Sequence, residues 1–179
     1  STGEAAAVFV ASELSAALHR DGSMALRRGN LSVFRDPSSC ASPGGLFAAV
    51  WDKERAYPFC KATGQADGKF SVRFRAGEAE YTARYNEWRL TATIRFHRQR
   101  PCLAITYSIR NLASHEKECA LLLYGEPSLA PLAEEKAHRA FSKLFVQSEA
   151  AKEQALLFFR STKRSEGALA IGMKNADFA

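Results

Sequence analysis

A regular alternation of apolar and polar side chains between Trp88 and Arg110 constrains the fold of this chain more than any other feature. Residues 88–96 place Trp, Leu, Ala, Ile and Phe on one face and Arg and Thr on the other. Residues 103–110 repeat the pattern, with Leu, Ile, Tyr and Ile opposite Ala, Thr, Ser and Arg. Because successive side chains of a β-strand point to opposite faces, both segments are predicted to be half-buried strands.

The next segment, Glu118 to Tyr124, is apolar at almost every position. A strand without alternation is typical of one that is covered on both faces. Polar connections at 97–101 and 111–117 separate it from the two strands before it. The three segments are therefore predicted to form an antiparallel meander, with the third strand in the centre of a layered sheet.

Hairpin patterns continue on both sides of this meander. Gly29-Asn30, Asp52 to Glu54 and Ala76-Gly77 each separate two short β-type segments, as turns between antiparallel strands do. A short helical turn is expected at 132–139, and further strands are expected at 144–148, 155–161 and 168–173.

The N-terminus differs from this pattern. Residues 1–20 are rich in Ala, and Val8, Leu14 and Leu18 lie near helical spacing, which predicts an amphipathic helix. The expected fold is mainly β: an antiparallel two-layer β-sandwich over residues 23–175 with this helix packed outside. We expect a single domain over residues 1–179.

Composition excludes several classes of protein. The net charge of +6 suggests nucleic acid, but Lys and Arg are scattered, the densest cluster is Lys163-Arg164, and no RNA-binding or zinc-finger spacing is present. A solvated basic surface without a nucleic-acid partner is therefore expected. No apolar run approaches the ~20 residues that span a bilayer, so no membrane segment is predicted.

The four cysteines, Cys40, Cys60, Cys102 and Cys119, lie far apart and form no C-x-x-C pair. Zinc-ligand spacing is therefore absent, and no metal or cofactor is expected. Free thiols, together with the lack of a visible signal peptide, favour a reducing, cytoplasmic location.

Two polar and aromatic stretches favour sugar recognition over catalysis, since no familiar catalytic motif is present. Aromatic faces stack on sugar rings, and charged groups form strong hydrogen bonds to hydroxyls. The stretches are Tyr124 to Pro127 and Ala137 to Phe145. A plainer interpretation places Phe141, Leu144 and Phe145 in the core and the basic residues on a solvated surface. The candidate substrate-binding residues are Tyr124, Glu126, His138, Arg139, Ser142 and Lys143; no catalytic residue is predicted.

The order of these residues also resembles a known family. Tyr-x-Glu, a proline-containing connection and then His-x-Ala-Phe-Ser-x-Leu-Phe-Val-x-x-Glu are similar to the cellobiose and chitobiose phosphorylases, formerly glycosyltransferase family 36. The resemblance is closest to bacterial cyclic β-1,2-glucan synthases and covers roughly residues 23–175. One departure is Arg139, where the family usually has a proline.

The resemblance implies an N-terminal β-supersandwich with a galactose-mutarotase-like fold. In the family this region precedes an (α/α)6 barrel that carries the general-acid aspartate, and no such barrel is present in this chain. A complete supersandwich is also longer than this chain, so a trimmed version or a fragment of a larger enzyme is expected.

The expected function is therefore a non-catalytic module of a glucan-processing glycosyltransferase or phosphorylase. Its expected partners are an oligosaccharide or β-glucan and the barrel of the parent chain, which could hold it at the cytoplasmic face of a membrane; a homodimer stays open. Two alternatives remain. One is an autonomous mutarotase- or epimerase-like enzyme, with His138 paired to Glu126 or Glu149 as acid and base. The other is an assembly domain without affinity for sugar.

Overall fold

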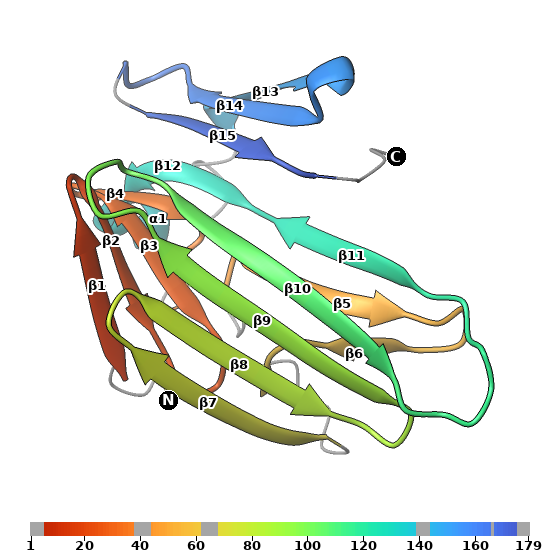
Figure 1. Ribbon diagram of the computed structural model, residues 1–179. Helices are drawn as coiled ribbons and strands as arrows, with labels where there is room; N and C mark the ends of the chain where they lie inside the picture. The colour runs from red at the N-terminus through yellow and green to blue at the C-terminus, as the bar shows by residue number, and fades with distance from the viewer. Residues whose placement is uncertain (1–5, 38–43, 62–67, 139–143, 166, 175–179) are drawn as a thin grey trace.

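The computed structural model describes residues 6–37, 44–61, 68–138, 144–165 and 167–174, and they form antiparallel β-sheets (Figure 1). The longest strands belong to a four-stranded sheet in the order β10-β9-β8-β7. Its strands are β7 (Lys69–Arg75), β8 (Glu78–Arg84), β9 (Trp88–Phe96) and β10 (Leu103–Asn111). All three pairings in this sheet are antiparallel, as the alternating pattern predicted.

Two sheets of shorter strands lie opposite this one. The first has the order β1-β2-β3-β4-β12, and the second has the order β11-β5-β6. The strands of the first are β1 (Ala7–Ala11), β2 (Leu14–Leu18), β3 (Met24–Arg28), β4 (Leu31–Phe34) and β12 (Pro127–Pro131). The strands of the second are β5 (Leu46–Trp51), β6 (Ala56–Pro58) and β11 (Ala120–Gly125).

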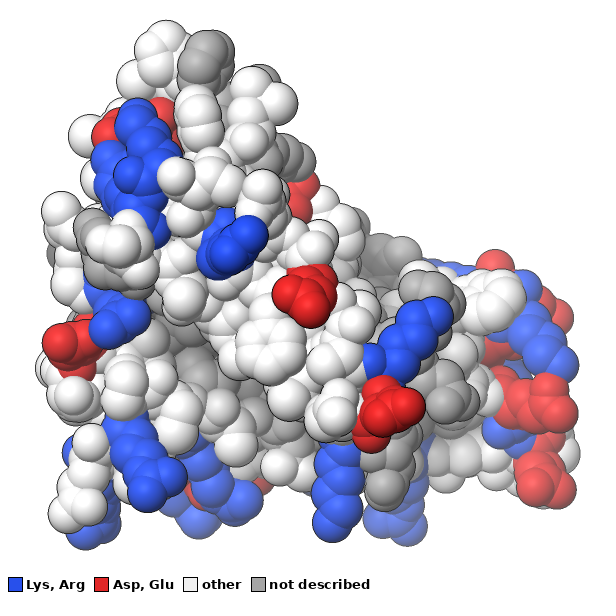
Figure 2. Space-filling view, turned by 90° about the horizontal axis from the view of Figure 1, so that it is seen from above, with Lys and Arg blue, Asp and Glu red and all other residues white. Residues whose placement is uncertain are grey.

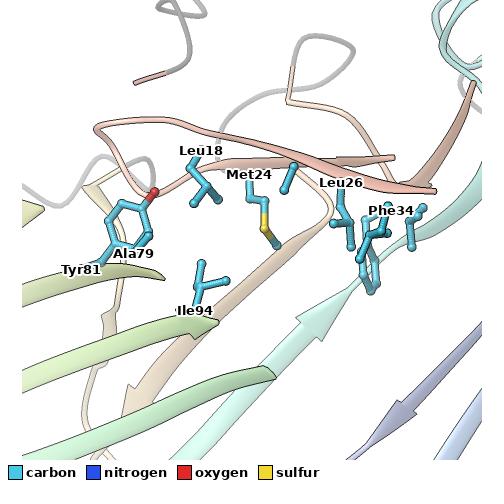
Figure 3. Packing of buried hydrophobic residues seen from close by; sticks show 10 residues of the cluster. Leu18, Met24, Leu26, Phe34, Ala79, Tyr81 and Ile94 are labelled. Carbon is cyan, nitrogen blue, oxygen red and sulfur yellow. The ribbon is translucent and has the colours of Figure 1, made fainter. Parts of the chain in front are cut away.

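Each of these two sheets covers one end of the inner face of β7 to β10. At one end, residues of β2, β3 and β4 pack on Ala79, Tyr81 and Ile94 (Figure 3). At the other end, Ala48, Val50 and Phe59 pack on a second group that includes Trp88 and Leu90, both essentially inaccessible. The protein is thus a two-layer antiparallel sandwich, which confirms the predicted fold class.

A fourth sheet follows the sandwich in the chain. It has the order β13-β14-β15, with β13 (Val146–Ala151), β14 (Leu156–Ser161) and β15 (Ala168–Gly172). A 3-10 turn, η2 (Lys152–Gln154), joins its first two strands, and α1 (Leu132–Ala137) precedes it. Leu169 and Ile171 of β15 pack against the first core cluster, so this sheet adds to the end of the sandwich where β12 lies.

The predicted N-terminal helix is wrong. Residues 7–18 form the hairpin of β1 and β2, whose turn contains Ser12 in the left-handed region at φ 55°. The spacing of Leu14 and Leu18 by four residues fits a helix and also an alternating strand. Ala16, with no exposed surface, shows that the true period is two. Pairing of β2 with β3 and burial on the sandwich outweigh the helical propensity of the alanines.

The predicted three-strand meander is also wrong in its third member. The strands β9 and β10 pair as expected, but β11 crosses to the opposite layer and pairs with β5. It lies at the edge of its sheet, and all six of its residues are exposed. The apolar run therefore does not mark a central strand within the described part of the chain.

A buried carboxylate connects the two layers at the end of the second core cluster. The side chain of Asp52 accepts hydrogen bonds from the backbone N–H groups of Glu54 and Arg55 and from Trp88 Nε1, at 3.3, 3.0 and 3.3 Å. Lys117 Nζ lies 3.4 Å from the same carboxylate. Burial by itself raises the pKa of Asp52, but these hydrogen bonds outweigh it and lower the pKa to about 2.

The three described cysteines, Cys60, Cys102 and Cys119, form no disulfide with one another. Cys40 lies outside the described residues.

The depressed pKa of Asp52 predicts a specific sensitivity to acid. Its charged form stabilises the fold fully above the ordinary value of 3.8, and this contribution is lost as the pH falls toward about 2. We expect that loss to amount to roughly 2 kcal/mol of unfolding free energy in the wild type, and to be absent in Asp52→Asn. Urea unfolding at pH 7 and at pH 2.5 measures the difference. An equal decrease in both proteins would contradict the assignment.

Candidate functional site

A pocket of about 250 Å³ opens where β12, α1 and the β13-β14-β15 sheet meet. This volume is on the scale of one small ring, below the size usual for drug-like ligands. Its lining combines apolar side chains with hydroxyl, imidazole and charged groups. The lining residues are Ser128, Leu129, Ala130, Glu134, His138, Phe145, Ser161, Lys163 and Arg164.

One wall of the pocket is formed by an irregularity in β12. The register of β12 against β4 shifts between Pro127 and Ala130, which is the signature of a β-bulge. Leu129, within this bulge, is only 3% exposed and has a φ of 49°. A non-glycine residue in the left-handed region costs on the order of 1–3 kcal/mol and persists where the surroundings enforce it. Such strain often accompanies a functional site.

The bulge is fixed by the buried carboxylate of Glu135, which is 1% exposed. Ser128 Oγ, in the bulge, donates a hydrogen bond to Glu135 Oε2 over 2.8 Å. The backbone N–H of Asp36, after β4, donates to Glu135 Oε1, also over 2.8 Å. The single helix turn α1 is thereby attached to two strands of the first sheet.

The rim of the pocket carries opposite charges. Glu134, next to Glu135 in α1, accepts hydrogen bonds from Arg164 Nη2 and from Lys163 Nζ, the latter at 3.4 Å. The hydrogen bond from Arg164 lowers the pKa of Glu134, with a smaller contribution from Lys163 and against the opposing effect of burial. Glu134 is therefore ionised at neutral pH, and the two cations are held in place at the rim.

The turn after β14 positions both cations. Ser161 Oγ accepts hydrogen bonds from the backbone N–H groups of Lys163 and Arg164, at 3.3 and 3.2 Å. A Cβ on Gly167, at the end of this turn, would lie 2.8 Å from the Cβ of Ser161, so the close approach requires glycine. The ammonium group of Lys163 lies 5.5 Å from the centre of the Phe145 ring, which places a cation beside an aromatic face.

These groups suit binding of a polar ring better than metal chemistry. Phe145 offers an aromatic surface, while Lys163 and Arg164 donate hydrogen bonds and Glu134 accepts them. Among the described residues, no group of three or more His, Cys, Asp or Glu side chains could hold a metal ion. In the same part of the chain, no helix is long and apolar enough to cross a membrane.

Only one of the predicted sugar-binding residues with a described position lines this pocket, namely His138. Tyr124 donates a hydrogen bond to Glu126, whose carboxylate also forms an ion pair with Arg35 at 2.9 Å. Neither Tyr124 nor Glu126 lines the pocket. Arg139, Ser142 and Lys143, and Phe141 between them, lie outside the described residues, so these predictions stay untested.

Sequence reasoning missed Glu134, Lys163 and Arg164. The densest basic cluster of the chain was visible but was interpreted as solvated surface, because the sequence does not show that Glu134 lies beside it. Phe145 was left open between the core and the sugar-recognition stretch; it is partly exposed and lines the pocket. The suggested partners of His138, Glu126 and Glu149, are not among the lining residues.

Comparison with known proteins adds one finding. A family described as glycosyl hydrolase 94, supersandwich domain, matches residues 52–176. The match includes β6 to β15 and every residue that lines the pocket, and it leaves β1 to β5 outside. It confirms the resemblance to the N-terminal supersandwich of the cellobiose and chitobiose phosphorylases. No curated protein sequence matches the chain.

The two neighbouring glutamates of α1 are predicted to respond differently to truncation. Glu135→Ala removes the acceptor for the Ser128 hydroxyl and the Asp36 backbone N–H, so it should lower the unfolding free energy by about 2–4 kcal/mol. Glu134→Ala removes only ion pairs at the exposed rim and should lower the unfolding free energy much less than Glu135→Ala does. Chemical denaturation of both variants measures this, and equal costs would show that Glu135 does not hold the bulge.

Proposed function

Since this chain belongs to the glycosyl hydrolase 94 supersandwich-domain family, we propose that it is a non-catalytic, carbohydrate-binding module of a glycoside phosphorylase or related glucan-processing enzyme. The observation that carries this proposal is the pocket beside the bulge of β12. It is of single-ring size, has one aromatic wall and has a rim of fixed donors and acceptors.

The proposed ligand is one glucosyl ring of a β-linked gluco-oligosaccharide. The C–H face of the sugar would lie on the accessible part of the Phe145 ring. Its hydroxyls would accept hydrogen bonds from Lys163 and Arg164 and donate to Glu134. Because these three side chains already hold one another, little conformational entropy is lost when the ligand binds.

The surface charge favours a neutral ligand over nucleic acid. On the face in Figure 2, Lys and Arg lie in several separate places with Asp and Glu among them, and they do not form one stripe. A nucleic-acid site usually requires a concentrated basic stripe.

We also propose that the module supports the (α/α)6 barrel of its parent enzyme and acts in the cytoplasm. We propose further that, within the family, the parent enzyme is closer to the cyclic β-1,2-glucan synthases than to the phosphorylases.

The autonomous-enzyme alternative is less well supported. Acid and base catalysis needs two groups whose protonation states differ and can exchange. The carboxylate that lines the pocket together with His138 is that of Glu134, whose pKa is lowered by the hydrogen bond from Arg164. A lowered pKa leaves little of the acid form at neutral pH and also makes the carboxylate a weaker base, so Glu134 suits neither role well. This favours a binding role for the site.

A first prediction concerns catalysis. The isolated protein should release neither glucose 1-phosphate from cellobiose in the presence of phosphate nor glucose from β-glucosides. A coupled assay for glucose 1-phosphate, read against a blank without protein, measures the first reaction. Release above the blank would refute the non-catalytic assignment.

A second prediction concerns binding. Titration with β-linked gluco-oligosaccharides, followed by amide chemical shifts, should give a dissociation constant near millimolar, or ~4 kcal/mol. The shifts should cluster at β12, α1 and residues 161–167. Arg164→Gln should weaken binding roughly tenfold, the equivalent of about 1.4 kcal/mol.

The matched control is Arg95→Gln, which removes another arginine that is paired with a glutamate, Glu78, at 2.6 Å but lies outside the pocket. This variant should bind like the wild type. Shifts elsewhere, or none at millimolar sugar, would refute the site and favour an assembly domain without sugar affinity.

A further inference from the structure

A row of four cations crosses the outer face of the four-stranded sheet, the face turned away from the two opposing sheets (Figure 1). The four residues lie directly opposite one another from β7 through β8 and β9 to β10, so their side chains project from the same face. All four are exposed. This cation row consists of Lys69, Arg84, Arg89 and Arg110.

The other end of the same face is compensated by acidic side chains. There, Arg73 pairs with Glu80 at 3.8 Å, and Arg95 pairs with Glu78 at 2.6 Å. These are cross-strand pairs of opposite charge, which stabilise a sheet. The contrast between the two ends shows that the sheet can neutralise its own arginines where they are structural.

The cation row has no such compensation. Within the described residues, none of its four members forms an ion pair. Glu87, two positions before Arg89, is already paired with Lys117 at 2.6 Å. Like charges placed directly opposite one another destabilise a sheet, so the cation row lowers the stability of the free protein. An arrangement that costs stability in this way is expected at a binding site.

A row of hydroxyl groups lies next to the cation row on the same face, about 7 Å further along the strands. The hydroxyls of its two central members, on β8 and β9, are 3.5 Å apart. Exposed cations beside hydroxyl donors are the side chains that usually contact phosphate oxygens. The hydroxyl row consists of Ser71, Thr82, Thr91 and Ser108.

The composition of this face narrows the class of partner. The outward positions of β7 to β10 hold no aromatic side chain and no apolar side chain larger than that of Ala104. Protein interfaces usually centre on aromatic or apolar anchors. Sheets that bind single-stranded nucleic acid stack its bases on aromatic side chains. This face therefore suits a contact made by charge and hydrogen bonds alone.

We propose that the outer face of β7 to β10 binds the headgroup layer of a bilayer that contains acidic phospholipids. Such a surface presents phosphate groups over a wide area and attracts clustered Lys and Arg without requiring apolar insertion. The cation row extends over three strand spacings, roughly 14 Å, and the hydroxyl row lies beside it to donate to phosphate oxygens.

This surface is separate from the candidate sugar pocket. None of the residues that line the pocket lies on β7 to β10. The membrane contact and the sugar site can therefore be occupied at the same time, and each can fail without the other.

Co-sedimentation with vesicles tests the contact. Vesicles of phosphatidylcholine alone are compared with vesicles in which about one third of the lipid is phosphatidylglycerol. The wild type should bind only the acidic vesicles. Its binding should weaken as the salt concentration rises, because salt screens the attraction between exposed charges.

The double variant Arg84→Gln/Arg89→Gln removes the two central cations of the row. Each cation near an acidic surface contributes about fivefold, so this variant should bind roughly twentyfold more weakly. The matched control, Lys136→Gln/Lys152→Gln, removes the same net charge from exposed positions of α1 and η2 and should bind like the wild type.

Urea unfolding separates this loss from a folding defect. The row variant relieves repulsion between like charges, so its midpoint should be no lower than that of the wild type.

Several outcomes would overturn the proposal. Equal binding to both kinds of vesicle, or none to acidic vesicles at low salt, would show that the face does not recognise acidic lipid. An equal loss in the two double variants would assign the effect to net charge. Tighter binding to a DNA duplex of about 20 base pairs, at equal phosphate concentration, would assign the face to nucleic acid instead.

Discussion

The candidate site depends on the hydrogen bonds that the buried carboxylate of Glu135 accepts. It lies in a helix of six residues, too short to be stable by itself, and it accepts hydrogen bonds from the strand before that helix and from the segment after β4. A buried carboxylate requires such partners, because an unpaired charge away from water costs several kcal/mol. The bulge of β12, the strained backbone of Leu129 and the position of Glu134 at the rim all follow from this requirement.

The sandwich itself explains why the site lies where it does. The sheet of β7 to β10 is longer than either sheet opposite it, so two sheets share its inner face and two core clusters form. The segment from β11 to β12 crosses between these two sheets, pairing first with β5 and then with β4. The pocket forms beyond this crossing, where the β13-β14-β15 sheet meets α1. Among the described residues, the same crossing places β11 at the edge of its sheet, with its apolar side chains partly exposed.

Much of the fold could be predicted because alternating apolar and polar residues directly indicate a half-buried strand. The pairs β9 with β10, β7 with β8 and β3 with β4 follow from alternating segments joined by short turns. The N-terminal hairpin could not be recognised, because Leu14 and Leu18 satisfy both periods and alanine favours a helix in isolation. The position of β11 was missed because an apolar strand usually indicates burial on both faces, whereas among the described residues β11 lies at the edge of its sheet. Of the predicted binding residues, only His138 lies at the pocket. The other polar groups of the pocket were missed because their ion pairs join residues about thirty positions apart in the sequence.

Contact between a sugar and the ring of Phe145 is the most direct measure of the proposed role. Intermolecular nuclear Overhauser effects between the ring protons of Phe145 and the C–H protons of a β-linked gluco-oligosaccharide report contacts at the pocket itself. We predict such effects at millimolar sugar in the wild type, from one glucosyl ring. Saturable binding without any effect to Phe145, or effects only to other aromatic rings, would contradict the assignment of this pocket as the carbohydrate site.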